Sequence, residues 1–263
     1  MKGNNYHYTK QDIISALKEV GLKPSDSIFI HSNIGFFGKL ENASTPEDYY
    51  YTFKESIFSL IGNHGTLIVP TFSYSFCNNH EFDPENTPSV CGFFSENLRK
   101  DKEAFRSFDA NFSIAAIGEK AKFFTESPTS HSFGINSFWD RLLQYNGKIV
   151  NFNFDAASTY IHFVEKQLNV PYRYDKPFPG TLILNNQKSE HVFYHFVFDH
   201  EKPQDGPDFA EFDRKAKEYG FASISNLGKG QIVSISVKDT TELIEKEFKT
   251  NPRFLTVGKN IIK

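Results

Sequence analysis

The sequence predicts an α/β protein: a largely parallel central sheet flanked by helices, followed by a smaller C-terminal part with mixed or antiparallel strands. Up to about residue 177, short apolar runs that end at turns alternate with amphipathic helical segments, as in a buried parallel sheet. After Pro179-Gly180, strand-like segments follow one another with few helices between them. The chain of 263 residues is long enough for one or two domains. We therefore predict an α/β part at 1–176 and an α+β part at 177–263, with one single domain as the alternative.

Clear start and stop signals predict the helices. Thr9 with Asp12 has the pattern of a capping box, and Gly21 would end that helix. Thr45-Pro46 marks a second start, because proline suits the first helical position. Four more helices are expected near 137–147, 156–168, 209–219 and 240–249.

The strands are predicted from apolar runs. In the first part they are 28–30, 66–69, 114–117 and 149–152, and in the second part 181–184, 191–198 and 231–237. The run 192–198 is almost continuously apolar or aromatic, which predicts packing on both faces.

Composition excludes several classes of protein. With 29 basic and 32 acidic residues the net charge is −3, which argues against nucleic acid as the main partner. No apolar run reaches the ~18 residues of a membrane helix, and the first residues lack a signal peptide, so we expect no membrane contact. Cys77 and Cys91 are expected to be reduced thiols of a cytoplasmic protein, with a single disulfide as the alternative.

Polar residues cluster where the predicted strands end. The strand ends carry His31-Ser32-Asn33, Thr71, Arg106-Ser107 with Ser113, and Asn153 with Asp155. Open α/β sheets bind ligands at the carboxyl edge, where backbone N–H groups can hold a phosphate or an oxyanion. For any one of these strand ends, an ordinary turn or a surface arginine is the alternative interpretation.

One pair of residues has the pattern of a general base. His162 and Glu165 are three residues apart, so a helix would place them on one face. A carboxylate beside a histidine fixes its tautomer and raises its basicity. The alternative is an ordinary surface ion pair.

A metal site is a weaker hypothesis. His191, His195 and His200 would be its ligands in a metal-dependent hydrolase. Their spacings of four and five do not repeat on one face of a strand, so structural histidines are the preferred interpretation and no metal is expected.

Several short motifs, in order along nearly the whole chain, resemble the aminoglycoside 3-N-acetyltransferase (antibiotic N-acetyltransferase) family. They are His31-Ser32-Asn33, 65–72, Phe82-Asp83-Pro84, Thr87-Pro88-Ser89, Arg106-Ser107, 113–118, Phe133-Gly134, the Thr-x-x-His-x-x-Glu segment 159–165, and 251–255. The resemblance implies that family's fold, not the GNAT fold. It also implies direct transfer of acetyl from acetyl-CoA to a sugar amine, without an acyl-enzyme.

The resemblance also implies residue roles. His162 matches the catalytic histidine and Glu165 its supporting carboxylate. The residues expected at the thioester and in the coenzyme pocket are His31, Ser32, Asn33, Thr71, Arg106, Ser107 and Ser113. We also predict a catalytic role for His31. Asp83 and Glu96 would face the incoming amine.

Departures from the family pattern bear on the acceptor. The strand before the catalytic helix reads Val-Asn-Phe-Asn-Phe-Asp at 150–155, in place of a Leu-Leu-Gly type end, and we assign Asp155 to the acceptor site. Arg173 and the small net charge suit an acceptor with one amine and a phosphate at least as well as a polycationic antibiotic, and a plain surface arginine is the alternative interpretation of Arg173. The acceptor is thus expected to be a nucleotide-linked precursor of a polysaccharide or an aminoglycoside. A homodimer and a non-catalytic CoA-binding protein are further hypotheses.

Overall fold

The structure is a computed structural model that describes residues 6–126, 129–199 and 206–257. Its first half contains α1 (Lys10–Glu19), β1 (Ser27–Ser32), η1 (Ile34–Phe37), α2 (Pro46–Ile61), β2 (Thr66–Pro70), η2 (Phe76–Asn78), α3 (Phe93–Lys100), β3 (Phe105–Arg106), β4 (Ile114–Gly118) and α4 (Ala121–Thr125). Its second half contains α5 (Phe138–Gln144), β5 (Lys148–Phe152), α6 (Ile161–Gln167), β6 (Arg173–Leu184), β7 (Gln187–Phe198), α7 (Ala210–Glu218), β8 (Ser223–Leu227), β9 (Gly230–Ser236) and α8 (Val237–Phe248).

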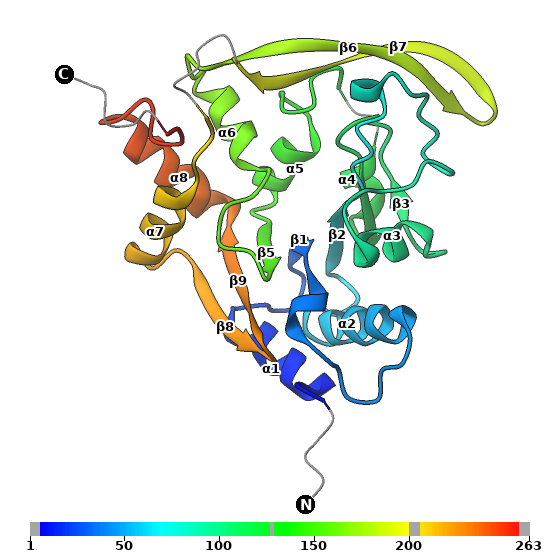
Figure 1. The fold of residues 1–263 in the computed structure, drawn as a ribbon, viewed down its shortest axis with the longest axis vertical. Helices are drawn as coiled ribbons and strands as arrows, with labels where there is room; N and C mark the ends of the chain where they lie inside the picture. Colours follow the sequence, from blue (N-terminus) through cyan, green and yellow to red (C-terminus); the bar gives the residue numbers. More distant parts are fainter. Residues whose placement is uncertain (1–5, 127–128, 200–205, 258–263) are drawn as a thin grey trace, which may run out of the picture.

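A seven-stranded sheet with the order β3-β4-β2-β1-β5-β9-β8 forms the centre of the molecule (Figure 1). Strand β1 pairs in parallel with β2 and with β5. The pairs that extend the sheet on both sides are antiparallel. The predicted α/β class is confirmed, and the parallel part is the central group β2-β1-β5.

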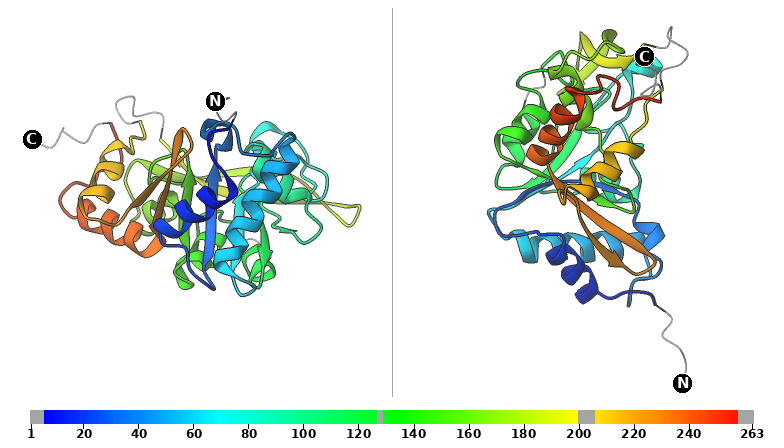
Figure 2. Two further views of the ribbon diagram at one scale, coloured as in Figure 1. Left: turned by 90° about the horizontal axis from the view of Figure 1, so that it is seen from below. Right: turned by 90° about the vertical axis from the view of Figure 1, so that its left-hand side faces the viewer.

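Helices cover both faces of this sheet, as the two views of Figure 2 show. Successive side chains of a strand point to opposite faces. Ile28 and Ile30 of β1 therefore pack with α1, α2 and α3. Phe29 lies on the other face, in a core to which α4, α5, α6, α7 and α8 contribute. Many of the 29 phenylalanines fill these two cores.

The long antiparallel hairpin β6–β7 lies outside the central sheet, across one end of the molecule (Figure 1). A small core beneath it contains Phe76, Phe82 and Phe193. The boundary expected at residue 176 falls inside β6, and β8 and β9 belong to the central sheet. The division into two domains stays a prediction.

Most predicted elements are present, with two differences. The helix expected at 156–168 spans only Ile161–Gln167, and β4 runs antiparallel to β2. In β7, Phe193 is buried in the small core beneath the hairpin, while Phe196 and Phe198, on the other face of the strand, are buried in the core that contains Phe29. The prediction that this run packs on both faces is therefore confirmed. No helix within the described ranges is both long and apolar enough to cross a membrane.

Candidate active site

A cavity of about 240 Å³ opens where β1 and β5 end and α6 begins. Its lining is made of two histidines, hydroxyl residues and aromatic rings: His31, Phe154, Ala157, Ser158, Thr159, His162 and Phe209. The carboxyl edge of the parallel strands is the expected place for a ligand in an open α/β sheet.

His162 and Glu165 form the hydrogen-bonded pair that their spacing predicts. His162 Nδ1 lies 2.8 Å from Glu165 Oε2, and the His162 side chain is 23% exposed. A carboxylate oxygen only accepts, so Nδ1 carries the hydrogen and Nε2 is left for a ligand. His162 is thus held in the tautomer that a general base needs.

Glu165 is completely buried and has a second partner. Arg173 at the start of β6 places Nε 2.8 Å from the same Oε2, and its side chain is 6% exposed. Burial alone would raise the pKa of Glu165, but the hydrogen bond and charge of His162 and the charge of Arg173 outweigh it and lower the pKa. The carboxylate therefore stays ionised beside His162.

The second histidine of the cavity is fixed at both ring nitrogens. His31 Nδ1 lies 3.3 Å from Asn151 Oδ1, and its Nε2 lies 3.2 Å from Thr159 Oγ1. His31 and Asn151 are register partners on β1 and β5. Burial lowers the pKa of His31 to about 4, so this ring is neutral near pH 7.

The loop between β5 and α6 is held by polar contacts with the end of β5 and with α7. Asn151 Nδ2 donates to the carbonyl oxygens of Asp155 and Ala157. The Ala157 amide donates to Asp213 on α7 at 2.8 Å. A helix from 156 would use the Asp155 and Ala157 carbonyl oxygens as acceptors, and Asn151 competes for both, so α6 begins later than predicted.

A comparison with known protein families identifies the family of this chain. The model of a family described as aminoglycoside 3-N-acetyltransferase matches residues 29–249, more than four fifths of the chain. The chain belongs to the aminoglycoside 3-N-acetyltransferase family. Among curated protein sequences, none matches it.

Solved structures of aminoglycoside acetyltransferases share the fold. AAC(3)-Xa is 20% identical, with a TM-score of 0.77 over 90% of this chain and 93% of that one. AAC-IIIb in a binary complex with CoASH is 18% identical, with a TM-score of 0.77 over 92% and 97%. AAC-VIa bound to sisomicin is 20% identical, with a TM-score of 0.77 over 92% and 98%. At these identities the likeness establishes the family's fold.

Three of the residues that the family resemblance assigns to the coenzyme form a buried network. Thr71 Oγ1 lies 3.1 Å from Ser113 Oγ, and Arg106 Nε donates to both hydroxyls. The remaining bonds of the Arg106 guanidinium go to the carbonyls of Thr71, Pro84 and Thr87, and burial lowers its pKa to about 9. The network ties β2 and β4 to the loop 83–89, and contact with the coenzyme stays a prediction.

The other expected coenzyme residues lie at two places. Ser32 and Asn33 follow His31 at the end of β1, beside the cavity, where Asn33 exchanges hydrogen bonds with the β5 end. Ser107 is buried and accepts from the Ile114 amide at 3.0 Å. These roles, too, stay predictions.

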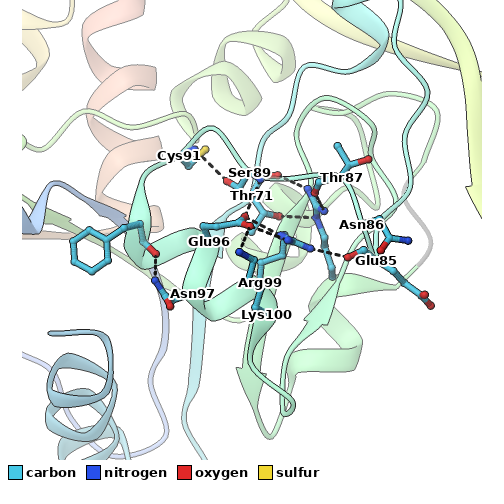
Figure 3. Close-up of polar contacts among 12 residues, drawn as sticks. Thr71, Glu85, Asn86, Thr87, Ser89, Cys91, Glu96, Asn97, Arg99 and Lys100 are labelled. Carbon is cyan, nitrogen blue, oxygen red and sulfur yellow. Dashed lines mark hydrogen bonds and ion pairs between the residues drawn. The ribbon is translucent and has the colours of Figure 1, made fainter. Parts of the chain in front are cut away.

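The acids expected to face the amine have partners of their own. Arg99 and Lys100 pair with Glu96, as Figure 3 shows. Burial acts against ionisation, but hydrogen bonds from Arg99, the Ser89 amide and Lys100 lower the pKa of Glu96 to about 2. Asp83 accepts from the Glu85 and Asn86 amides in the neighbouring turn.

Two further residues expected at the acceptor site lie near the cavity. Asp155 pairs with Lys217 at 3.0 Å. Arg173 stands behind Glu165 and contacts it directly. A direct contact of either residue with the acceptor stays a prediction.

The histidines of the metal hypothesis do not come together in the described ranges. His191 is exposed on β7, and His200 lies outside the described residues. His195 is buried, 2.9 Å from Asn111 Nδ2 and 3.8 Å from Cys77 Sγ. Cys77 and Cys91 are free thiols, and burial raises the pKa of Cys77 to about 11.

Sequence reasoning missed several residues of the site. Asn151 orients both His31 and the loop, and its signal is an amide inside an apolar strand. Phe209 lines the cavity from just before α7, far along the chain, and has no local signal.

Proposed function

We propose that this protein transfers an acetyl group from acetyl-CoA to the primary amine of an amino sugar, with His162 as general base. The observation that carries the proposal is the buried, ionised Glu165 that holds His162 at 2.8 Å on the wall of the cavity. A positioned base of this kind contributes about 10²–10⁴-fold to a rate.

In the proposed reaction, His162 is the only residue of the protein that takes up and releases a proton. A sugar ammonium first loses one proton to solvent and binds as the neutral amine. Its nitrogen attacks the thioester carbonyl, the N–C bond forms, and His162 Nε2 takes one of the two remaining amine protons. The C–S bond then breaks, and the CoA thiolate takes that proton from the imidazolium. The products are the acetamide and the CoA thiol.

Membership of the acetyltransferase family and the AAC-IIIb complex with CoASH support acetyl-CoA as the donor. The Asn33 amide at the end of β1 donates to the Phe152 carbonyl oxygen at 2.9 Å, so it is not a free donor for the oxyanion of the tetrahedral intermediate. Direct transfer requires both substrates to be bound at once.

The cavity lining favours an acceptor of low positive charge. None of the seven described residues that line it is a carboxylate, and two of them are phenylalanines. Asp155, near the cavity, is already paired with Lys217. AAC-VIa binds sisomicin, so aminoglycosides stay among the candidates beside nucleotide-linked amino sugars.

A thiol-release assay tests this function. Purified protein with acetyl-CoA is offered sisomicin, gentamicin and UDP-glucosamine in separate reactions. We expect CoA release with at least one amine, and with UDP-glucosamine above the antibiotics. Bound acetyl-CoA without release for any amine would favour the non-catalytic alternative.

His162→Ala tests the general base. We expect acetyl transfer to fall by about 10²–10⁴-fold or more, with the melting temperature and acetyl-CoA binding little changed. His64→Ala is the matched control, because His64 is 76% exposed and lies outside the cavity lining. Normal turnover by the His162 variant contradicts the proposal.

A further inference from the structure

The contacts of Asn151 determine which atom of its amide faces His31. The amide nitrogen donates to two carbonyl oxygens, those of Asp155 and Ala157. Carbonyl oxygens only accept, so the nitrogen must be on that side and the amide oxygen faces His31 Nδ1 at 3.3 Å. If the Asn151 amide were turned over, its oxygen would face the two carbonyl oxygens and both hydrogen bonds would be lost.

The same reasoning fixes the tautomer of His31. Because Asn151 Oδ1 only accepts, His31 Nδ1 carries the hydrogen of the neutral ring. Nε2 is then a bare acceptor. Thr159 Oγ1 lies 3.2 Å from it, so the threonine hydroxyl donates its single hydrogen to His31. The low pKa of His31 agrees with a neutral ring near pH 7.

A hydroxyl whose hydrogen is already committed can only accept from a ligand. Thr159 and His162 both line the cavity, and the Thr159 carbonyl accepts the His162 amide at 3.1 Å, so one turn of chain joins them. The cavity therefore has two acceptors in its lining, Thr159 Oγ1 and His162 Nε2. A neutral primary amine carries two N–H bonds that match them.

We propose that Thr159 accepts a hydrogen bond from the acceptor amine beside His162, and that Asn151 and His31 are positioning residues that orient the Thr159 hydroxyl. The inference rests on the proposed function and adds to it the way the nucleophile is oriented. With its two N–H bonds directed to Thr159 and His162, the amine points its lone pair away from both. That direction is the one in which the thioester carbonyl must lie for attack.

A pair of Thr159 variants tests the contact with the amine. Thr159→Val keeps the shape and removes the acceptor, whereas Thr159→Ser keeps the acceptor. We expect the valine variant to lower kcat/KM for the amine by about 10- to 100-fold and the serine variant to lower it by less than about threefold. The KM for acetyl-CoA should not change in either. Equal activity of the valine variant and the parent overturns the proposal.

A pair of His31 variants tests the positioning role. In His31→Gln the introduced side-chain amide reaches the place of Nε2 and can accept from Thr159, whereas the shorter side chain of His31→Asn reaches only the place of Nδ1. We expect the glutamine variant to retain most of the kcat and the asparagine variant to lose about tenfold. A merely structural role would affect both alike, and that outcome contradicts the proposal.

Nitrogen-15 NMR of the histidines in the whole protein tests the tautomer without reference to activity. At pH 7 we expect His31 with a protonated Nδ1 and an unprotonated Nε2, and a shift of the Nε2 resonance in Thr159→Val. A proton on Nε2 overturns the inference. If the parent protein acetylates no amine, the proposed function fails and the amine contact with it. If His162→Ala is inactive while Thr159→Val is unaffected, only this inference fails.

Discussion

At the scale of single residues, Glu165 has the most demanding position in the site. Its carboxylate is fully buried and contacts His162 and Arg173 through the same oxygen. Removing one partner of a buried ion pair costs about 3–5 kcal/mol, because the other charge stays buried without compensation. Arg173→Met is therefore expected to lower the free energy of unfolding by about that amount.

The pH dependence of that stability follows from the lowered pKa of Glu165. An acid whose pKa is lowered by folding stabilises the protein above its unfolded pKa, and this stabilisation is lost as the pH falls through the folded pKa. Urea unfolding of the parent and of Arg173→Met should thus differ most at neutral pH. The double variant Glu165→Gln/Arg173→Met provides the control. It should recover part of the loss, and simple additivity of the two substitutions would contradict a direct ion pair.

At the scale of elements, Asp213 connects α7 to the loop before α6. It accepts from the Ala157 amide, and burial together with the nearby charge of Asp155 raises the pKa of Asp213 to about 6. An acid with a raised pKa binds its proton more tightly in the folded state, so stability falls as the pH rises from about 4 to 6.

Asp213→Asn tests this connection. Asparagine keeps an oxygen that can accept from the Ala157 amide and has no charge to bury. We expect the variant to gain stability relative to the parent at pH 8 and to gain less at pH 5, as measured by urea unfolding. Asp213→Ala, which leaves the amide unbonded, should lose both stability and acetyl transfer. A gain that does not change with pH would contradict the argument.

Elements with signals at both ends could be predicted from the sequence. The capping box predicted for Thr9 with Asp12 is present in the structure, and the helix start predicted at Thr45-Pro46 is confirmed, with a second capping box formed by Thr45 and Asp48. The segment 156–160 has a helical pattern but is held as a loop by Asn151 at the end of β5 and by Asp213 on α7, and the contact with Asp213 is a distant one that no local pattern encodes. The sequence pattern also could not predict that β4 runs antiparallel to β2, because a buried apolar run has the same pattern in a parallel and in an antiparallel strand.

At the scale of the whole molecule, the sequence predicted the carboxyl edge of the central strands as the site, and the cavity lies there. His31 at the end of β1 and Ser158 and Thr159 in the loop after β5 line it. The polar residues after β2 and before β4, Thr71 and Ser113, form a buried network with Arg106 instead. Small polar residues at a strand end can serve either purpose, and only the three-dimensional packing distinguishes them. The predicted homodimer and cytoplasmic location stay predictions.

The hairpin β6–β7 joins the site to the far end of the molecule, because its base carries Arg173 and its distal half packs on η2 (Figure 1). A Cβ added at Gly180 would lie 2.5 Å from Phe76 Cδ1, which forces the ring or the hairpin to move.

We expect Gly180→Ala to lower the free energy of unfolding by about 1–3 kcal/mol. It should also speed hydrogen exchange at the amides of Phe82 and Ile183, which bond the hairpin to the chain beneath it. Acetyl transfer should persist, because Arg173 pairs with Phe198 at the opposite end of the hairpin.

The matched control is Gly206→Ala, where the added Cβ meets only an ordinary contact at 3.5 Å. On the same samples, hydrogen-exchange mass spectrometry measures the effect on the distal half of the hairpin, and the thiol-release assay measures the effect on its base. If Gly180→Ala lowers acetyl transfer as much as Arg173→Met does, the hairpin moves as one rigid body and its tip is coupled to Glu165. If exchange rises only in the distal half while transfer is kept, the base is held independently by the ion pair with Glu165, as the burial of that pair implies.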